Sequence, residues 1–279
     1  MKKSDKNYPN LVIIGPPKTG STSLFHYLEQ HPDVCGSSKK ETYFFYDHAD
    51  ETSYYKNFNT HGLDPYFEYF KHYANEKVIV EASPSYVYMK TPLEQFLKFP
   101  EPPKIFFVHR DPAKRVYSEY TFSKYKLKSF EGSFADYLGF DGQSFTSERF
   151  KEGFYESYLN NWRKAFQENV YSFEFQELSN NPLGFMKKVC LAVDIDPTFY
   201  EDYDFSVKNK TAGLRNVGLH KFALKVKDKL PKGIFRLLNP IYSKLNSYQI
   251  PAMNEEEAKL VELLKQAYKN KSVEVTKHG

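Results

Sequence analysis

The sequence predicts an α/β protein with a parallel central sheet flanked by helices. Short apolar runs alternate along the chain with segments of helical period, and this alternation is typical of strand–helix–strand units. Two of these runs, 11–14 and 104–108, pass into a helix through a turn that contains Gly or Pro. A chain of 279 residues, 41% of them hydrophobic, suits one domain with insertions or at most two, and we predict a single domain over 1–279.

The apolar runs and the amphipathic segments predict four strands and five helices. The strands are 11–14, 78–81, 104–108 and 170–175. The helices are 20–30, 112–127, 154–168, 182–193 and 255–269. Aromatic residues and a leucine form one stripe along 154–168, which indicates a buried helix face rather than a cofactor site. Asn181 before Pro182, and Asn254 before three glutamates, are typical helix starts.

The segment 11–24 predicts an anion site at the carboxyl end of the first strand. A turn with glycines and prolines follows the apolar residues 11–14, and a helix begins near 19–21. Such a turn directs backbone N–H groups and the positive end of the helix dipole to one place. Lys18 adds a full charge, and residues 21–23 add hydroxyl donors. We therefore predict a phosphate site.

The position of the lysine separates two kinds of phosphate site. Nucleotide triphosphatases place it directly after the second glycine of G-x-x-x-x-G-K-[ST]. Gly15 and Gly20 have that spacing, but Ser21 follows Gly20 and the lysine is Lys18. This displacement argues against ordinary ATP or GTP hydrolysis. A P-loop phosphotransferase resembling a nucleotide kinase is the competing class, and it would bind ATP with Mg²⁺.

A second strand-to-helix turn, within 104–120, carries an arginine suited to phosphate. Asp111 is a good N-cap and Pro112 fits the first helical position. Arg110 therefore lies at the carboxyl end of the strand, and Ser118 lies about two turns into the helix. Ligands of open parallel sheets bind at that edge. An arginine fork can donate two hydrogen bonds to one phosphate.

The two motifs, P-K-T-G-S-T and R-D-P-x-x-R-x-x-S-x-Y, resemble in order and spacing the phosphate-binding motifs of sulfotransferases. These enzymes use 3′-phosphoadenosine 5′-phosphosulfate (PAPS) as sulfonate donor and release 3′-phosphoadenosine 5′-phosphate (PAP). The resemblance, closest to the bacterial and heparan-type branch, implies a P-loop-like α/β fold and sulfonate transfer to a hydroxyl or amine without a metal. It implies that Arg110 and Ser118 hold the 3′-phosphate, and that Lys18 also stabilises the leaving oxygen. The 5′-phosphosulfate would be held by Lys18, Thr19, Gly20, Ser21 and Thr22.

The resemblance also suggests a general base. The segment K-E-T-Y-F-F is similar to one in heparan-type and related bacterial sulfotransferases, whose glutamate equivalent to Glu41 is the proposed base. The aromatic residues that follow would partly withdraw this carboxylate from water. The residues alone also fit a solvated acid paired with Lys39 or Lys40. His48 and His109 are rival bases, because cytosolic small-molecule sulfotransferases use a histidine.

Two positions depart from the heparan-type pattern. The strand end V-E-A-S-P-S-Y resembles E-K-[ST]-P-x-Y, but Ala82 stands where those enzymes carry a lysine thought to assist catalysis or acceptor binding. Tyr43 stands where some relatives carry an auxiliary histidine. These departures leave open a non-catalytic relative that retains the nucleotide pocket but has lost turnover.

Other segments are expected to complete the site. A late loop in 205–216 has the Lys/Asn/Gly/Arg character of loops that close over the nucleotide in the family, or it is a solvated basic loop; its candidates are Lys208, Lys210 and Arg215. The long segments 43–73 and 126–153 match no simple core element, and we expect them to shape the acceptor cleft. The acceptor we favour is a carbohydrate or glycolipid.

Composition limits the partners and the compartment. The net charge of +4 is mild and no nucleic-acid-binding motif is present, so no nucleic-acid partner is expected. The two distant cysteines, Cys35 and Cys190, predict a reducing compartment. No apolar run follows the charged N-terminal residues, and we expect a bacterial cytoplasmic enzyme without a membrane anchor. The C-terminal part, about 221–279, is expected to be helical, and its basic amphipathic stretch 221–245 packs on its own domain or makes weak contact with a membrane surface. The sequence does not indicate the oligomeric state.

Overall fold

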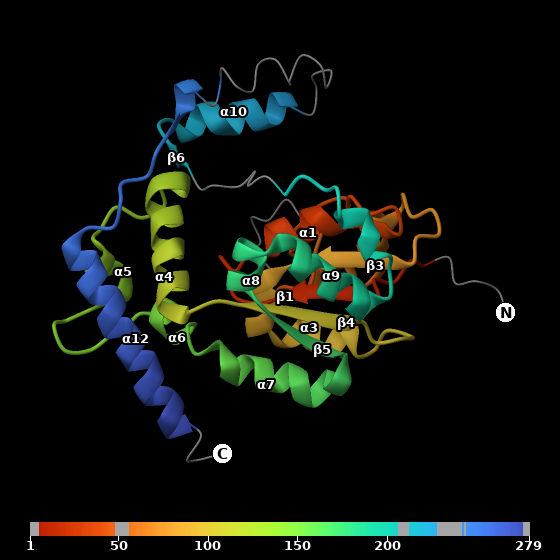
Figure 1. Cartoon of the computed structure of the whole chain (residues 1–279), viewed down its shortest axis with the longest axis horizontal. Coiled ribbons are helices and arrows are strands. Elements are labelled where there is room, and N and C mark those ends of the chain that lie inside the picture. The colour runs from red at the N-terminus through yellow and green to blue at the C-terminus, as the bar shows by residue number, and fades with distance from the viewer. Residues whose placement is uncertain (1–5, 48–55, 206–211, 228–241, 243, 276–279) are drawn as a thin grey trace. The chain divides into compact units, whose positions relative to one another are not determined.

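The computed structural model describes residues 6–47, 56–205, 212–227, 242 and 244–275 (Figure 1). It divides into two units, each with its own elements. The first unit combines Met1–Asp111 with Phe154–Ser206, and the second combines Pro112–Gly153 with Val207–Gly279. The single domain over 1–279 stays a prediction.

A five-stranded parallel sheet forms the centre of the first unit, in the order β2-β3-β1-β4-β5. The strands are β1 (Leu11–Ile14), β2 (Val34–Gly36), β3 (Val78–Ala82), β4 (Lys104–His109) and β5 (Val170–Glu174). All four predicted strands are confirmed, and β2 is an addition. Leu11 is in register with both Val80 of β3 and Lys104 of β4. The carboxyl ends of these strands therefore meet at one edge of the sheet.

Helices cover both faces of this sheet (Figure 1). The α-helices of the first unit are α1 (Ser21–Leu28), α2 (Phe58–His61), α3 (Lys90–Phe96), α7 (Tyr155–Phe166), α8 (Phe175–Asn180) and α9 (Pro182–Val193). Short 3₁₀ segments are η1 (Asp64–Phe70), η2 (Pro84–Tyr88), η4 (Gln167–Asn169) and η5 (Pro197–Tyr200). Figure 1 shows α1, α8 and α9 on one face and α3 and α7 on the other. The predicted fold class is confirmed.

Two hydrophobic clusters fill the space between the sheet and its helices. Alternate residues of β1 point to opposite faces, so Leu11 and Ile13 join the cluster under α1 and α9, and Val12 and Ile14 join the cluster over α7. The predicted stripe of the helix 154–168 is buried in the second cluster. Strands buried on both faces are apolar runs, which is why 11–14, 78–81 and 104–108 were predictable. The edge strand β5 is only partly buried, and its Val, Tyr and Phe residues indicated it.

The segment 43–73 differs from its expected role as a loop outside the core. Four aromatic residues in the described part of this segment are fully buried in the second cluster; they are Phe44, Phe45, Tyr66 and Phe70. Their rings meet at edge-to-face and tilted angles, with Phe45 and Tyr66 at 4.7 Å between centroids. Such pairs stabilise a core beyond the area they bury. Much of this segment therefore builds the fold.

The second unit consists mainly of helices. Its elements are α4 (Pro112–Thr121), a π-helical turn η3 (Phe122–Leu127), α5 (Phe134–Leu138), α6 (Glu148–Lys151), α10 (Val217–Lys227), α12 (Glu255–Val275) and the antiparallel pair β6 (Gly213–Leu214) and β7 (Ser247–Tyr248). The predicted loop 126–153 contains α5, which a capping box between Ser133 and Asp136 begins. Most of the stretch 221–245 lies outside the described residues.

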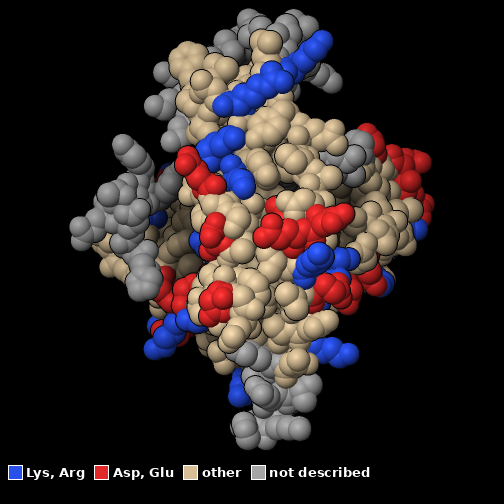
Figure 2. Space-filling model, turned by 90° about the vertical axis from the view of Figure 1, so that its left-hand side faces the viewer, with Lys and Arg blue, Asp and Glu red and all other residues tan. Residues whose placement is uncertain are grey.

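Charged side chains on the face shown in Figure 2 are mixed in sign. Small groups of Asp and Glu stand between Lys and Arg over the described part of that face. Local ion pairs in the second unit include Lys151 with Glu148 and Lys265 with Glu262. Exposed pairs of this kind contribute little to the free energy of folding.

Candidate nucleotide and catalytic site

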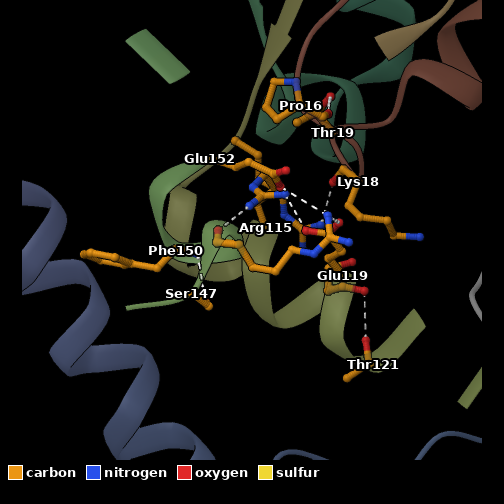
Figure 3. A network of polar contacts seen from close by, with 12 residues as sticks. Pro16, Lys18, Thr19, Arg115, Glu119, Thr121, Ser147, Phe150 and Glu152 are labelled. Atoms are coloured by element: carbon orange, nitrogen blue, oxygen red, sulfur yellow. Dashed lines mark hydrogen bonds and ion pairs between the residues drawn. The ribbon is translucent and has the colours of Figure 1, made fainter. Parts of the chain in front are cut away.

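The loop after β1 has a backbone conformation that favours glycine at positions 15 and 20. Gly15 has φ +135°, and a Cβ at this position would lie 2.8 Å from the backbone oxygen of Val108 on β4. The Thr19 hydroxyl donates to the Pro16 carbonyl at 2.9 Å and closes the turn (Figure 3). Gly20, with φ +88°, is the left-handed residue from which α1 starts. The loop is therefore held as a preformed turn.

This turn presents donors to the carboxyl edge of the sheet. The first N–H groups of a helix have no intrahelical acceptor, and here they belong to Ser21 and Thr22. The helix dipole adds positive potential at the same place. In Figure 3 the Lys18 side chain extends away from the contact between Pro16 and Thr19. Because the Thr19 hydroxyl hydrogen is used inside the loop, only the backbone N–H of Thr19 is left as a phosphate donor.

Arg110 is joined to this loop. Its Nη1 donates to the Lys18 carbonyl at 3.0 Å, which brings the two predicted phosphate motifs together. The guanidinium lies over the ring of Phe175, with 4.6 Å from Cζ to the ring centroid. The Tyr155 hydroxyl donates to the backbone oxygen of Arg110. Contacts on its guanidinium and its backbone thus hold Arg110 at the end of β4.

Glu41 lies at the same edge of the sheet, because its backbone N–H donates to the carbonyl of Ala82 at the end of β3 (2.9 Å). Its carboxylate is paired with Lys40 and accepts a hydrogen bond from the Tyr43 hydroxyl at 2.9 Å. The side chain is 37% exposed, so this carboxylate is partly withdrawn from water. The aromatic rings at 44 and 45 turn into the core. Tyr43, which stands at the place of an auxiliary histidine in some relatives, is a direct partner of the candidate base.

Of the two rival histidines, His109 lies within the described residues. His109 ends β4, and its ring stacks on Phe107 at 6.1 Å between centroids. His48 lies outside the described residues.

The other predicted nucleotide contacts lie in the second unit or outside the described residues. Ser118 is a half-buried residue of α4 in the second unit. Arg215 is exposed in the same unit, where its Nη1 donates to the carbonyl of Leu245 at 3.2 Å. Lys208 and Lys210 lie outside the described residues. The roles of these four residues stay predictions.

A buried ion network around Arg115, the second arginine of the R-D-P-x-x-R motif, was not predicted from the sequence. Arg115 is fully buried, and it donates to Glu119 at 2.7 Å and to the carbonyl of Arg149 at 3.2 Å (Figure 3). Burial, followed by the charge of Glu119, raises the pKa of Glu152. The spacing of Arg115 and Glu119 by four residues was the available signal. This arginine ties α4 to α6 within the second unit.

Two other features are absent from the described ranges. None of their His, Cys, Asp and Glu side chains gather in threes or more with the geometry of a metal site. None of their helices combines the length and apolar character needed to cross a bilayer.

The fold and the two joined motifs define an α/β protein with a P-loop-like fold. A family model described as "Sulfotransferase domain" matches residues 8–209, which is most of the chain. The chain therefore belongs to the sulfotransferase family, as its two motifs predicted.

Known relatives are similar to parts of this chain. The membrane-associated sulfotransferase kil1 of Dictyostelium discoideum is 35% identical over 123 residues, which is 43% of this chain and 24% of that protein. Heparan sulfate glucosamine 3-O-sulfotransferase 3A1 of Mus musculus is 28% identical over 198 residues, 68% of this chain and 46% of that protein. The chain thus matches less than half the length of either relative. A solved sulfotransferase from Alicyclobacillus acidocaldarius has the same fold, with a TM-score of 0.61, 22% identity, and coverage of 85% of this chain and 96% of that chain.

Proposed function

We propose that this chain is a PAPS-dependent sulfotransferase that moves the sulfonate of PAPS to a hydroxyl or amine and releases PAP. The observation that carries the proposal is the hydrogen bond between the Arg110 guanidinium and the Lys18 carbonyl at 3.0 Å. It brings together an anion-binding turn and an arginine that follow two different strands. A nucleotide with phosphate groups at both ends of its ribose fits such a pair.

The loop residues are assigned to the 5′ end of the donor. The N–H groups at the start of α1 hold the 5′-phosphate oxygens, since they are unpaired within the helix and lie at its positive end. Arg110 receives the 3′-phosphate on its guanidinium, which Phe175 supports from one side. Ser118, Lys208, Lys210 and Arg215 stay proposed contacts of the same nucleotide.

Lys18 and Glu41 carry out the transfer. As the acceptor oxygen forms a bond to sulfur, the bond between sulfur and the bridging oxygen of the 5′-phosphate breaks, as in phosphoryl transfer. The Lys18 ammonium stabilises the negative charge that grows on this leaving oxygen. Glu41 takes the proton of the acceptor hydroxyl. Each carboxylate oxygen has more than one acceptor direction, so Lys40 and Tyr43 can orient Glu41 while it bonds to the acceptor.

We further propose a carbohydrate or glycolipid acceptor. The mouse relative is named as a heparan sulfate glucosamine sulfotransferase, which supports a sugar. Leu219 and Phe222 on α10 are 45% and 65% exposed, and these apolar side chains support weak contact with a lipid surface. Ala82 lacks the amine found in heparan-type enzymes, so the acceptor differs from theirs or is held by other groups.

The cytoplasm is the compartment we propose. Cys35 and Cys190 are both buried free thiols, and burial raises their pKa values to about 11 and about 12. Both thiols are therefore protonated at neutral pH and react slowly.

Calorimetric titration with PAP and with Mg-ATP tests the class of nucleotide. We expect binding of PAP and much weaker binding of ATP. Tighter binding of ATP, together with transfer of its phosphoryl group, would establish the kinase-like alternative instead.

Turnover tests whether the chain is an enzyme or a non-catalytic relative. PAPS is incubated with a library of sugar, glycolipid and amine acceptors, and PAP release is followed for the wild type and for Glu41→Gln. We expect acceptor-dependent release by the wild type and strongly reduced release by the variant. PAP binding without release on any acceptor in the library would favour the non-catalytic relative.

A further inference from the structure

A second glutamate, Glu81, is fully buried close to the candidate base and has no part in the proposed transfer. It is the fourth residue of β3, next to Ala82, whose carbonyl binds the backbone of Glu41. Its exposed fraction is 0%. A carboxylate in that position is costly unless hydrogen bonds replace its water. The hydrogen-bond partners of the Glu81 carboxylate therefore explain why its burial is tolerated.

Three hydroxyl groups converge on the Glu81 carboxylate. Thr42 and Ser83 donate to Oε1 at 2.6 and 2.9 Å, and the Tyr66 hydroxyl donates to Oε2. Thr42 also lies 3.1 Å from the hydroxyl of Tyr86. Donors reach both oxygens, so hydrogen bonds replace much of the water that the buried carboxylate has lost. It joins β3, η1 and the turn that carries Glu41.

That turn has an unusual backbone. Glu41 and Tyr43 both have positive φ, 59° and 58°, a region that residues with a side chain rarely adopt. Such conformations persist only where the surroundings impose them. Between these two residues lies Thr42, which is 0% exposed and bonded to Glu81. The buried hydrogen bond from Thr42 to Glu81 therefore holds the middle residue of the strained turn 41–43.

Further contacts lock the chain after the turn. The backbone N–H of Phe44 donates to the Thr42 hydroxyl at 3.3 Å, and that of Phe45 donates to the Tyr86 hydroxyl at 3.2 Å. The Thr42 hydroxyl thus donates a hydrogen bond to the Glu81 carboxylate and accepts one from the Phe44 N–H. Removing either Glu81 or this hydroxyl releases the support of two positive-φ residues, one of which is Glu41.

We propose that Glu81 is a positioning residue that holds the turn 41–43 through the Thr42 hydroxyl, so that the Glu41 carboxylate stays directed at the acceptor. The assignment rests on the proposed function, in which Glu41 is the base. Glu81 does not touch substrate; it acts through Thr42.

Two substitutions test the hydrogen bond from Thr42 to Glu81, which is called the anchor below. Thr42→Val keeps the shape of the side chain and removes its hydroxyl, and Glu81→Gln replaces an oxygen acceptor by an N–H₂ group. Thr42→Ser, which keeps the hydroxyl, is the matched control. We expect kcat to fall about 10- to 100-fold in Thr42→Val and Glu81→Gln, because small displacements of a reacting group cost that much. We expect PAP affinity within about twofold of wild type, and near-normal kcat in Thr42→Ser.

A purely structural role is separated from positioning by a double variant. If Thr42 acts through Glu41, adding Thr42→Val to Glu41→Gln causes no further loss of kcat, because interacting sites are not additive. A full additional loss in the double variant would overturn the proposal. So would a Thr42→Val protein that is folded by circular dichroism and has wild-type kcat.

The results for these variants also distinguish failure of the positioning role of Glu81 from failure of the proposed function on which it rests. Wild-type turnover and loss of activity in Glu41→Gln establish the base whatever Thr42→Val does. With that established, wild-type kcat in Thr42→Val refutes only the anchor. An active Glu41→Gln protein refutes the base and the anchor together, while PAP binding and wild-type turnover still support a sulfotransferase. If Glu81→Gln fails to fold, Thr42→Val decides the question.

Discussion

Lys18 and Arg110 carry different parts of the proposed reaction, although one hydrogen bond links them. The Lys18 backbone, with φ 74°, belongs to the turn, and its carbonyl is the acceptor for Arg110. Its ammonium is the part assigned to the leaving oxygen. The Arg110 guanidinium is oriented by Phe175 and is assigned to the 3′-phosphate. The two side chains should therefore fail in different ways when they are removed.

Lys18→Ala should lower kcat about 100- to 1,000-fold, the cost of removing one donor from a developing oxyanion. PAP affinity should change far less, because the charge on the bridging oxygen grows only during transfer. Steady-state kinetics with PAPS and calorimetry with PAP measure the two quantities. Lys71→Ala is the control, since Lys71 is an exposed lysine of the same unit paired with Glu68. Equal losses of kcat and affinity would contradict the assigned role.

Arg110→Ala should weaken PAP binding about 10- to 100-fold, as expected for hydrogen bonds between charged groups. Its preference for PAP over adenosine 5′-phosphate should largely disappear, because the second nucleotide lacks the 3′-phosphate. Calorimetry with both nucleotides gives the ratio. Arg163→Ala, which removes a half-exposed arginine paired with Glu156, should leave that ratio unchanged. A strong remaining preference for PAP in Arg110→Ala would mean that another group holds the 3′-phosphate.

At the scale of elements, the site depends on how β1 meets α1. β1 is hydrogen-bonded to both β3 and β4, so the turn after it must pass close to the end of each neighbour. The N–H of Gly15 donates to the carbonyl of Pro84 at 3.1 Å, and its Cα faces β4. A side chain at this point has no room. The shape of the turn after β1 is therefore set by the sheet beneath it.

Gly15→Ala should abolish PAP binding and lower the free energy of unfolding by about 1–3 kcal/mol, the usual cost of overpacking. The added Cβ would meet the Val108 carbonyl oxygen at 2.8 Å, which is backbone and cannot rotate away. Calorimetry with PAP and denaturant unfolding measure both effects. Gly62→Ala is a matched control, because Gly62 also has positive φ (+66°) but nothing within 4 Å of its Cβ position. Normal PAP binding in Gly15→Ala would show that the turn tolerates a different shape.

At the scale of the whole molecule, the described chain has two units, and its single tryptophan reports on one of them. Trp162 is 1% exposed in the second cluster of the first unit, where its Nε1 donates to the Val87 carbonyl at 3.2 Å. Its fluorescence therefore follows unfolding of the unit that holds Lys18, Glu41 and Glu81. Stability and site can be studied together through this one probe.

The stability of the first unit should depend on pH through Glu81. Burial raises the pKa of Glu81 above its ordinary value of 4.5, although hydrogen bonds oppose this shift. The folded state then binds the proton more tightly than the unfolded state. Relative to Glu81→Gln, the wild type should lose free energy of unfolding as the pH rises from below 4.5 through the folded-state pKa. Urea unfolding followed by Trp162 fluorescence at several pH values measures this difference; a difference that grows in the opposite direction would contradict the sign.

The sequence was sufficient for the features that depend on local pattern. The strands at 11–14, 78–81 and 104–108 were predictable because strands buried on both faces are apolar runs. The edge strand at 170–175 was predictable from its β-branched and aromatic residues. The strand β2 was missed, since its three residues are too few to show a period. The turn between β1 and α1 was predictable because the spacing of its glycines is local.

Three features were decided only by tertiary structure, because they depend on which distant segments meet. The sequence alone did not show that 43–73 supplies core aromatics, that Glu41 is half-buried beside Lys40 and Tyr43, or that Glu81 is buried against three hydroxyls. Local pattern determined the family. Long-range packing decided the environment of each carboxylate, since burial and hydrogen-bond partners come from chain segments far apart in the sequence.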